Sequence, residues 1–383
     1  MSSKKRKAVY AASLDPITNG HINVATRMAK RYDKLTVVVA VDPRKHYFFN
    51  HEERVSMAKA ALAHLPNVTV DACVGQYVVK FAKSLGADVV IRGLRNASDL
   101  DSEFTLAEEN RQICPDIETI LVPCLPSLMY VSSSLVRGHV GTDPDWETQV
   151  ARLAPASVVV KLKEKYILGK ARTHWSALMS ALGNPKESEK FFTDLVTRYS
   201  EVHRGYHTLS HVVTMLDDLE AARPTETGSW EYVAFATWFH DAVYDPLLGN
   251  NEERSAMLAK AAAERLGLPK PGPMEDRRSF GDVVFDLIMD TKHVVRPETE
   301  LGKLIVDLDL ANFGKSLKEF EAVGVGIRKE YCFVPEDKFR AGRAKILSGF
   351  LKHRPLYLTK FFRNKYQKSA RKNLRHAVDL LSN

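Results

Sequence analysis

The sequence predicts a chain of two parts, an α/β doubly wound parallel-sheet domain followed by an all-α domain. Up to about residue 166, short β-branched runs such as Leu35–Val41 alternate with amphipathic stretches such as His51–His64. This alternation indicates a parallel sheet covered by helices on both faces. Beyond Trp175 nearly every segment has helical spacing. The length, 383 residues, also exceeds what one hydrophobic core usually supports.

The predicted sheet has five short apolar strands. They are Ala8–Ser13, Leu35–Val41, Val68–Cys73, Ala87–Ile91 and Glu118–Pro123. Between these strands lie segments with helical spacing, at Gly20–Tyr32, His51–His64, Tyr77–Leu85 and Asp99–Ile113. Since ligands bind beyond the carboxyl ends of the strands in such sheets, we expect functional side chains to follow the strands.

The second half reads as a series of helices. They are predicted over Glu187–Tyr199, His211–Ala222, Trp230–Ala242, Glu252–Leu266, Phe280–Asp290, Leu317–Tyr331 and Pro335–Phe350. The stretch before them carries Gly141, Pro144, Pro155 and Gly169 and reads as transitional. We therefore expect domains at 1–166 and 175–383, joined by a linker at 167–174.

Composition limits the setting and the partners. Hydrophobic residues make up 45% and charged residues 27%, as in ordinary globular proteins. No apolar run reaches about 18 residues, so no membrane span is expected. The four cysteines form no C-x-x-C pair, which favours a reduced, cytoplasmic protein. The net charge of +8 suits substrates with several phosphates. Without a zinc finger or an aromatic RNA-binding motif, nucleic acid is not an expected partner.

The C-terminal tail is strongly basic. Its cations are Lys360, Arg363, Lys365, Lys368, Arg371, Lys372 and Arg375. We interpret it as the solvated face of a helix, with a phosphate- or RNA-binding surface as the alternative.

The first polar cluster follows the first strand and runs from Ser13 to His21. Thr18 and His21 are three residues apart at the start of a helix, so they share a face. Gly20 allows close approach of a ligand to the backbone. Free amides at the helix start attract phosphate, and a histidine there can donate to phosphate oxygens. Helix capping or packing is the competing interpretation.

Three further clusters follow later strands. Lys45 lies after the second strand, Arg92 and Arg95 flank a Gly-Leu turn, and Ser132–Ser134 precede a helical stretch. Arginines and hydroxyls of this kind recognise phosphate or ribose. Alone, each could be a surface loop or a helix cap. Together, at successive strand ends, they favour a nucleotide site.

The motifs D-P-I-T-N-G-H, R-G-L-R and V-S-S-S, at these separations, resemble bacterial phosphopantetheine adenylyltransferases, over about Ala8 to Tyr166. The resemblance implies a Rossmann-like nucleotidyltransferase of the H-x-G-H group. It implies transfer of AMP from ATP, with Mg²⁺, to 4′-phosphopantetheine in coenzyme A biosynthesis. The products would be dephospho-coenzyme A and pyrophosphate. It also implies a homo-oligomer, commonly a hexamer.

The resemblance also assigns residues. Catalytic roles would fall to Thr18, His21, Lys45 and Arg92. ATP would be bound by Ser13, Thr18, His21, Arg95, Glu103, Ser132, Ser133 and Ser134. The acceptor would be bound by Ser13, Lys45, Val78 and Arg92. This sequence departs from the family pattern at Leu14, Gln76 and Ser102. A second hypothesis is therefore a different phosphate-ester acceptor, such as nicotinamide mononucleotide.

The helical half carries residues typical of a metal site. His207 and His211 are spaced i, i+4, so they point the same way. His240 and Asp241 are adjacent, and Asp307 lies inside an apolar run. A chance helical pair or a buried polar pair would explain each alone. Imidazoles and carboxylates from several helices are what a metal site in a bundle core requires.

This half resembles the HD superfamily of metal-dependent phosphohydrolases, through Y-H-x-x-x-H, W-F-H-D-A-V-Y-D, N-E-E-R-S-A, D-x-D-L and F-R-x-G-R-A. The resemblance implies hydrolysis of a phosphate ester with Mn²⁺, Fe²⁺, Co²⁺, Ni²⁺ or Zn²⁺. The implied ligands are His211, His240, Asp241 and Asp307, with His207 as a ligand or beside them. Asp245, Lys292, His293 and Arg340 are candidates for substrate contact. The fusion suggests a nucleotide or a coenzyme A precursor as substrate. A third hypothesis makes one half a non-catalytic nucleotide- or metal-binding regulatory module.

Overall fold

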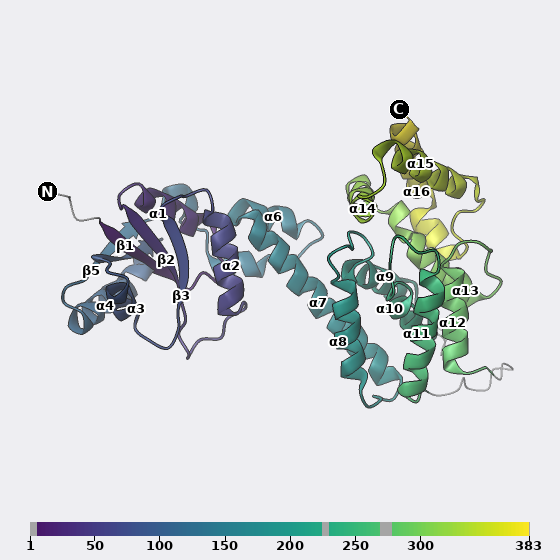
Figure 1. The fold of residues 1–383 in the computed structure, drawn as a ribbon, viewed down its shortest axis with the longest axis horizontal. Helices are drawn as coiled ribbons and strands as arrows, with labels where there is room; N and C mark the ends of the chain where they lie inside the picture. Colours follow the sequence, from purple (N-terminus) through teal and green to yellow (C-terminus); the bar gives the residue numbers. More distant parts are fainter. Residues whose placement is uncertain (1–5, 224–229, 269–277, 383) are drawn as a thin grey trace. The chain divides into compact units, whose positions relative to one another are not determined.

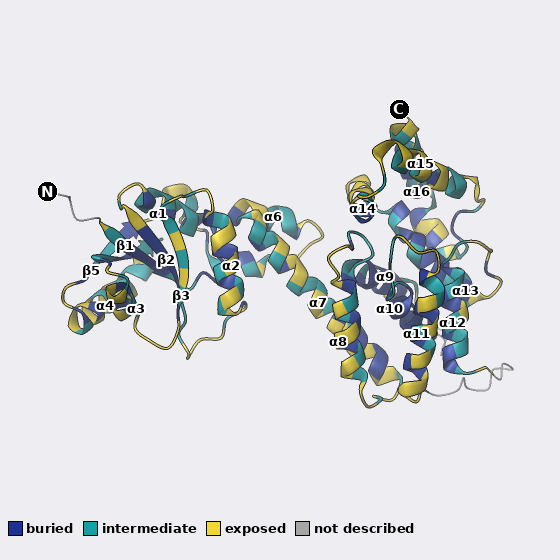
Figure 2. Ribbon diagram, in the orientation of Figure 1, coloured by how far each residue is buried: buried dark blue, intermediate teal, exposed yellow. Residues whose placement is uncertain are grey.

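The computed structural model describes residues 6–223, 230–268 and 278–382. The chain forms two compact units, Met1–Tyr166 and Ile167–Asn383. Each unit contains its own buried core, as the dark blue segments of Figure 2 show.

The N-terminal unit contains a five-stranded sheet in the order β3-β2-β1-β4-β5 (Figure 1). The strands are β1 Lys7–Ala12, β2 Lys34–Ala40, β3 Val68–Cys73, β4 Val89–Leu94 and β5 Glu118–Pro123. Every pairing is parallel, which confirms the predicted parallel sheet.

Helices cover both faces of this sheet. They are α1 Asn19–Ala29, α2 His51–Leu62, α3 Val78–Ser84, α4 Ala97–Ile113, α5 Ser133–Gly138 and α6 Trp146–Leu153, with a short 3₁₀ turn η1 at Pro126–Leu128. Successive residues of β1 enter different cores, because side chains alternate along a strand. Tyr10 packs with Val24 of α1, whereas Val9 packs with Val79 of α3. The sheet is thus doubly wound.

The order of strands reverses beside β1. β1 pairs with β2 on one side and with β4 on the other, so chain connections leave in opposite directions at the β1–β4 junction. Such a switch point opens a crevice at the carboxyl ends of the strands. β4 extends further than predicted, because Arg92 and Gly93 pair with Leu121 and Val122 of β5. Arg92 therefore has the fixed backbone of a strand.

The second unit is helical. Its elements are α7 Ala156–Ala181, α8 Ser188–Tyr199, α9 Leu209–Ala222, α10 Trp230–Phe239, α11 Asn251–Arg265, α12 Phe280–Asp290, α13 Glu300–Asp309, η2 Leu310–Gly314, α14 Leu317–Glu330, α15 Glu336–Lys352 and α16 Lys360–Ser382. α7 begins in the first unit and continues into the second. Residues 167–174, expected to form a linker, are therefore helical, and Ala171 is buried in the core of the second unit.

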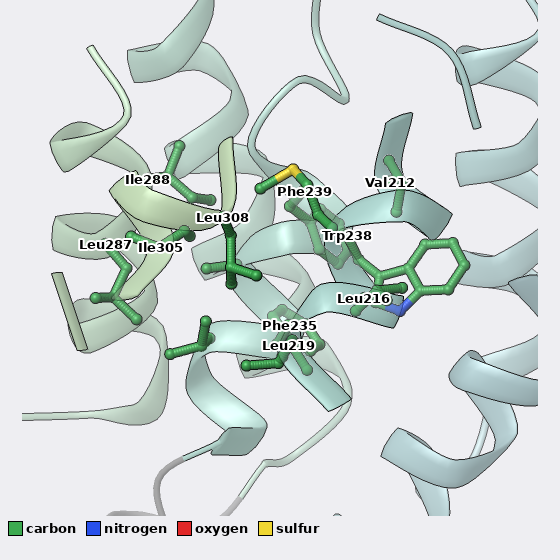
Figure 3. Packing of buried hydrophobic residues seen from close by; sticks show 14 of the residues in the cluster. Val212, Leu216, Leu219, Phe235, Trp238, Phe239, Leu287, Ile288, Ile305 and Leu308 are labelled. Carbon is green, nitrogen blue, oxygen red and sulfur yellow. The ribbon is translucent and has the colours of Figure 1, made fainter. Parts of the chain in front are cut away.

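α10 lies at the centre of this core. All its residues from Tyr232 to Phe239 are buried, as expected for a helix surrounded by others. Figure 3 shows Trp238 and Phe239 packed among side chains of the neighbouring helices, including Val212 of α9 and Leu308 of α13.

The basic tail forms α16, whose apolar positions follow helical spacing. Phe362, Tyr366, Ala370 and Leu374 are buried. Most of the basic side chains lie on the exposed face, in agreement with the solvated-helix interpretation. Within the described ranges, no helix is both long and apolar enough to cross a bilayer.

Candidate active sites

A cavity of about 550 Å³ opens at the carboxyl ends of β1 and β4. The sequence-predicted residues that line it are Ser13, Thr18, His21, Lys45, Arg92, Arg95, Glu103, Ser132, Ser133 and Ser134. Only Val78 of the predicted set lies elsewhere. It begins α3 and packs into the core on the other face of the sheet, against the group that contains Val79 and Ala82. The acceptor role expected for Val78 thus has no support from its position.

His21 is held in one orientation at the start of α1. The backbone N–H of Thr18 donates to His21 Nδ1 at 3.1 Å, and Thr18 Oγ1 lies 2.9 Å from the same atom. With Nδ1 as acceptor, the proton of the neutral ring is on Nε2. Burial, together with the charges of Arg95 and Arg92, lowers the pKa of His21 to about 4. At neutral pH His21 is therefore a neutral donor through Nε2.

Both arginines are oriented by carboxylates. Arg92 donates to Glu103 through Nε at 2.7 Å and Nη2 at 2.8 Å, while its Nη1 donates to the Ala11 carbonyl at 2.7 Å. Arg95 donates to Asp99 in the same two-pronged manner, with both distances 3.0 Å. Glu103, expected to bind ATP, thus positions Arg92. The sequence identified both arginines but gave no signal for this pairing.

The serine segment is tied to the first loop. Ser132 Oγ accepts from the backbone N–H of Leu135 at 3.1 Å and caps α5, and Ser133 Oγ donates to the Pro16 carbonyl at 2.8 Å. Arg137, which the sequence analysis missed, donates to the Asp15 carbonyl and also lines the cavity. Its signal was the i, i+4 spacing from Ser133, which points both side chains the same way.

Asp15 and Arg54 fix the loops around the cavity. The Asp15 carboxylate accepts from the backbone N–H groups of Phe48 and Phe49, both at 2.9 Å. Buried Arg54 donates to the carbonyls of Ser13 at 2.7 Å and Ala40 at 3.4 Å. These bonds join the loops after β1 and β2, which carry Ser13 and Lys45.

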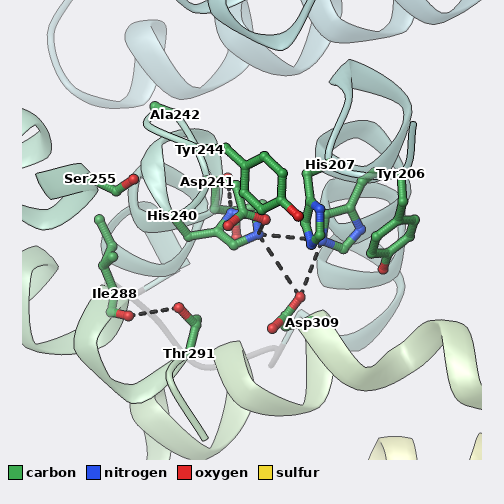
Figure 4. Close-up of polar contacts among 12 residues, drawn as sticks. Tyr206, His207, His240, Asp241, Ala242, Tyr244, Ser255, Ile288, Thr291 and Asp309 are labelled. Carbon is green, nitrogen blue, oxygen red and sulfur yellow. Dashed lines mark hydrogen bonds and ion pairs between the residues drawn. The ribbon is translucent and has the colours of Figure 1, made fainter. Parts of the chain in front are cut away.

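In the helical unit, His211, His240 and Asp309 offer ligand atoms that all lie within 4.8 Å of one another. The Nε2 atoms of His211 and His240 are 3.3 Å apart, and His211 Nε2 is 3.2 Å from Asp309 Oδ1. His240 Nδ1 lies 2.9 Å from the Thr237 carbonyl, to which it must donate, so a neutral ring presents its Nε2 lone pair to the cluster. A metal-bound histidine is held in this way. Figure 4 shows Asp309 facing His240.

Asp307 is not part of this cluster, which corrects the sequence-based assignment. Its buried carboxylate accepts from the backbone N–H groups of Leu358 and Thr359 and from Thr359 Oγ1, each at 2.7 Å. Two residues on a helix are about 200° apart, so Asp307 and Asp309 point to opposite sides of α13. Asp309 is the second aspartate of the D-x-D-L motif, and the orientation of α13 in the fold directs it, and not Asp307, toward the histidines.

Asp241 and His207 lie beside the cluster. Asp241 Oδ2 is 3.0 Å from His240 Nε2, and His207 Nδ1 is 2.8 Å from Glu330 Oε2. Glu330, which the sequence did not reveal, also accepts the backbone N–H groups of residues 205–207. Burial alone would lower the pKa of His240, but Asp241 and Asp309 raise it to about 9. Against burial, His240 and His207 hold the pKa of Asp241 well below its usual range.

The four candidates for substrate contact divide evenly. Lys292 and His293 line a cavity beside the cluster, and His293 Nε2 is 2.8 Å from Asp309 Oδ2. Asp245 and Arg340 do not line it. Asp245 accepts from the Leu247 N–H in its own loop, and Arg340 donates to the Leu380 carbonyl at 2.6 Å.

The parallel sheet and its switch-point cavity define the N-terminal unit as a Rossmann-like nucleotidyltransferase domain. The model of the cytidylyltransferase-like family matches residues 9–139. Phosphopantetheine adenylyltransferase of Herpetosiphon aurantiacus is 40% identical over 159 residues, which are 42% of this chain and 93% of that protein. The enzyme of that name from Proteus mirabilis is 37% identical over 163 residues, 42% of this chain and 99% of its own length. Through this unit, the chain belongs to the phosphopantetheine adenylyltransferase family.

Among solved structures, nicotinic acid mononucleotide adenylyltransferase of Plasmodium falciparum, complexed with NaAD, aligns with 43% of this chain and 96% of its own. The identity is 18% and the TM-score is 0.33.

Proposed function

We propose that the N-terminal unit transfers AMP from ATP to 4′-phosphopantetheine, giving dephospho-coenzyme A and pyrophosphate. The observation that carries this proposal is the cavity at the β1–β4 junction. There, His21, two oriented arginines and the serine segment surround one space large enough for a nucleotide. The similarity to named phosphopantetheine adenylyltransferases over nearly their whole length supports the same reaction.

In this mechanism an oxygen of the acceptor phosphate attacks the α-phosphorus of ATP in line. The bond between the α-phosphorus and the bridging oxygen of the β-phosphate breaks, and pyrophosphate leaves with that electron pair. His21 donates from Nε2 to a phosphate oxygen, and Arg92 and Arg95 offset the growing negative charge. Mg²⁺ bound with ATP would neutralise further charge on the leaving group. Since no covalent enzyme intermediate is needed, positioning by Glu103 and Asp99 is central.

The positions of the departures from the family pattern favour phosphopantetheine over a nucleotide acceptor. Leu14 lines the cavity, but Gln76 and Ser102 do not. Ser102 Oγ donates to the Asp99 carbonyl at 2.8 Å, within its own helix. Two of the three changes therefore lie away from the cavity wall. A direct comparison of phosphopantetheine and nicotinamide mononucleotide as acceptors tests this preference, and faster turnover of the mononucleotide would reverse it.

We further propose that the helical unit is a metal-dependent phosphohydrolase. His211, His240 and Asp309 would hold a divalent ion, with Asp241 beside it. The donor set of imidazole and carboxylate suits Mn²⁺, Fe²⁺, Co²⁺, Ni²⁺ or Zn²⁺. A bound ion would activate water and polarise the phosphate. In hydrolysis, the water oxygen bonds to phosphorus, the ester P–O bond breaks, and the released oxygen takes up a proton. His207, which is oriented by Glu330 and lines the cavity, would supply that proton.

The test of this second activity is release of phosphate from a phosphate ester by the full-length protein with each metal in turn. Activity that requires metal and is lost in Asp309→Asn would support the proposal. Metal binding without turnover of any ester would instead favour the regulatory-module hypothesis for this half.

A further inference from the structure

The cavity beside the metal-ligand cluster has two unlike walls and a volume of about 420 Å³. One wall carries His207, His240, Asp241 and Asp309. The other is formed largely by apolar side chains of α14, α15 and the segment between them: Val323, Ile327, Val334, Phe339, Ile346 and Phe350. A ligand that fills this cavity therefore contacts both the polar cluster and hydrocarbon side chains.

Arg343 of α15 also lines this cavity. Across residues 6–223, 230–268 and 278–382, it makes no hydrogen bond and no ion pair. The ionisable groups that act on it are the phenols of Tyr206, Tyr331 and Tyr244, and burial lowers its pKa. A partly buried guanidinium without a carboxylate partner is costly unless an anion binds there.

The other cations of this cavity are differently placed. Lys292 forms an ion pair with Glu253, and Lys338 is exposed to water. The His293 ring lies against Asp309, with 2.8 Å between Nε2 and Oδ2. Tyr206 and Arg343 line the same cavity, and the Tyr206 ring packs against that of His211, with 4.6 Å between the ring centres. One phosphate group beside Tyr206 could therefore meet both the guanidinium and the cluster.

We infer that Arg343 binds the phosphate of a monoester whose organic part is aromatic or largely apolar and lies against α14 and α15. This inference rests on the proposed phosphohydrolase function of the same site and specifies its substrate class. A single unpaired guanidinium matches one phosphate group, since a polyphosphate chain would require several cations. The apolar wall favours an organic group that gains from leaving water.

The experiment uses the full-length protein with Mn²⁺ and two probes. Binding of phenylphosphonate, which cannot be hydrolysed as an ester, is measured by calorimetry. Hydrolysis of phenyl phosphate and of glycerol phosphate is measured by phosphate release. The variants are Arg343→Met, Arg343→Lys and the matched control Lys345→Met, which removes one charge from the same helix outside the cavity. Metal content and thermal unfolding are checked for each.

We expect Arg343→Met to weaken phenylphosphonate binding and raise the KM for phenyl phosphate by about tenfold or more, because a hydrogen bond to a charged group is lost. Arg343→Lys should have an effect on binding and KM between those of the parent and Arg343→Met, because lysine keeps the positive charge but lacks the planar set of N–H donors of a guanidinium. Lys345→Met should stay within about twofold of the parent. Glycerol phosphate should be the poorer substrate by about tenfold, for lack of an apolar group.

The outcomes separate the inference from the function on which it rests. Phenylphosphonate binding that depends on Arg343, without any hydrolysis, would support the binding site and refute the hydrolase activity. Metal-dependent hydrolysis with an unchanged KM in Arg343→Met would support the hydrolase and overturn the role of Arg343. Equal KM values for the two esters would overturn the apolar part of the inference, and absence of any binding or hydrolysis would overturn all of it.

Discussion

His21 and His240 are both inside candidate active sites, yet their pKa values move in opposite directions. Burial and the positive charges of Arg95 and Arg92 lower that of His21 to about 4. The carboxylates of Asp241 and Asp309 overcome burial and raise that of His240 to about 9. The charged side chains that act most strongly on His21 are thus cations, and those that act on His240 are carboxylates. On the proposed functions, the first half would bind phosphate with its own cations, whereas the second would bind it through a metal ion.

The largest expected effect concerns the metal-ligand cluster. Asp309→Asn removes the only carboxylate among the three convergent residues of the described chain. We expect the affinity for Mn²⁺ or Zn²⁺ to fall by more than about 100-fold, beyond the loss typical of residues that merely support a ligand. Elemental analysis after dialysis against a metal buffer measures this. Full occupancy in the variant would contradict the assignment of Asp309.

The next prediction concerns the positioning of Arg92. Glu103→Gln keeps the side-chain shape but removes the charge that orients the guanidinium. We expect kcat/KM for phosphopantetheine to fall by about 10- to 100-fold, because a misplaced positioning group costs that much. The KM for ATP should change little. A raised KM for ATP with an unchanged kcat would instead support the role in ATP binding that the family resemblance implied.

Asp307→Asn should lower stability without affecting metal binding, in contrast to Asp309→Asn on the same helix. Its carboxylate accepts three hydrogen bonds at the start of α16, and an amide accepts fewer of them. We expect the free energy of unfolding to fall by about 1–3 kcal/mol, the usual cost of leaving buried donors unsatisfied. Chemical denaturation gives this value, and metal content should match that of the parent protein. Loss of metal at unchanged stability would restore Asp307 as a ligand.

The smallest effect is a spectroscopic one. Since the pKa of His21 lies below the usual value, its ring should remain neutral as the pH falls from 7 to 5 and gain a proton only near pH 4. The imidazole NMR signal that disappears in His21→Gln should therefore titrate at about 4. A midpoint near 6.5 would mean that neither burial nor the two arginines lower the pKa of this ring, and the contrast with His240 would be lost.

The N-terminal site was predictable from the sequence because strand ends converge in space. In a parallel sheet, the residues that follow β1 and the last residues of β4 meet at one edge, so Ser13, His21 and Arg92 could be grouped by order alone. Val78 lies apart from this group because it follows β3 and begins α3, which packs on the opposite face of the sheet. The pairing of Arg92 with Glu103 could not be predicted from the motifs, because it depends on how the two side chains are oriented in the fold.

In the helical unit, the sequence identified only some of the side chains that the fold brings together. The histidines came from i, i+4 spacing and from the His-Asp doublet, which the fold brings together. Choosing between Asp307 and Asp309 required knowing which face of α13 points toward the histidines. That face is set only when the helix packs against its neighbours. Glu330 of α14 pairs with His207, and Arg343 of α15 lines the cavity. Both residues lie far along the chain, and only the packing of the helices brings them to these positions.

The measurement that tests the central claim most directly is product formation by the full-length protein with ATP, Mg²⁺ and 4′-phosphopantetheine. Dephospho-coenzyme A and pyrophosphate are followed by chromatography, with His21→Ala as the matched sample for contaminating enzyme. We predict equal amounts of both products, and a fall of about 10²- to 10³-fold in kcat when the His21 donor is removed. Absence of dephospho-coenzyme A, from protein that still binds ATP, would contradict the proposed acceptor.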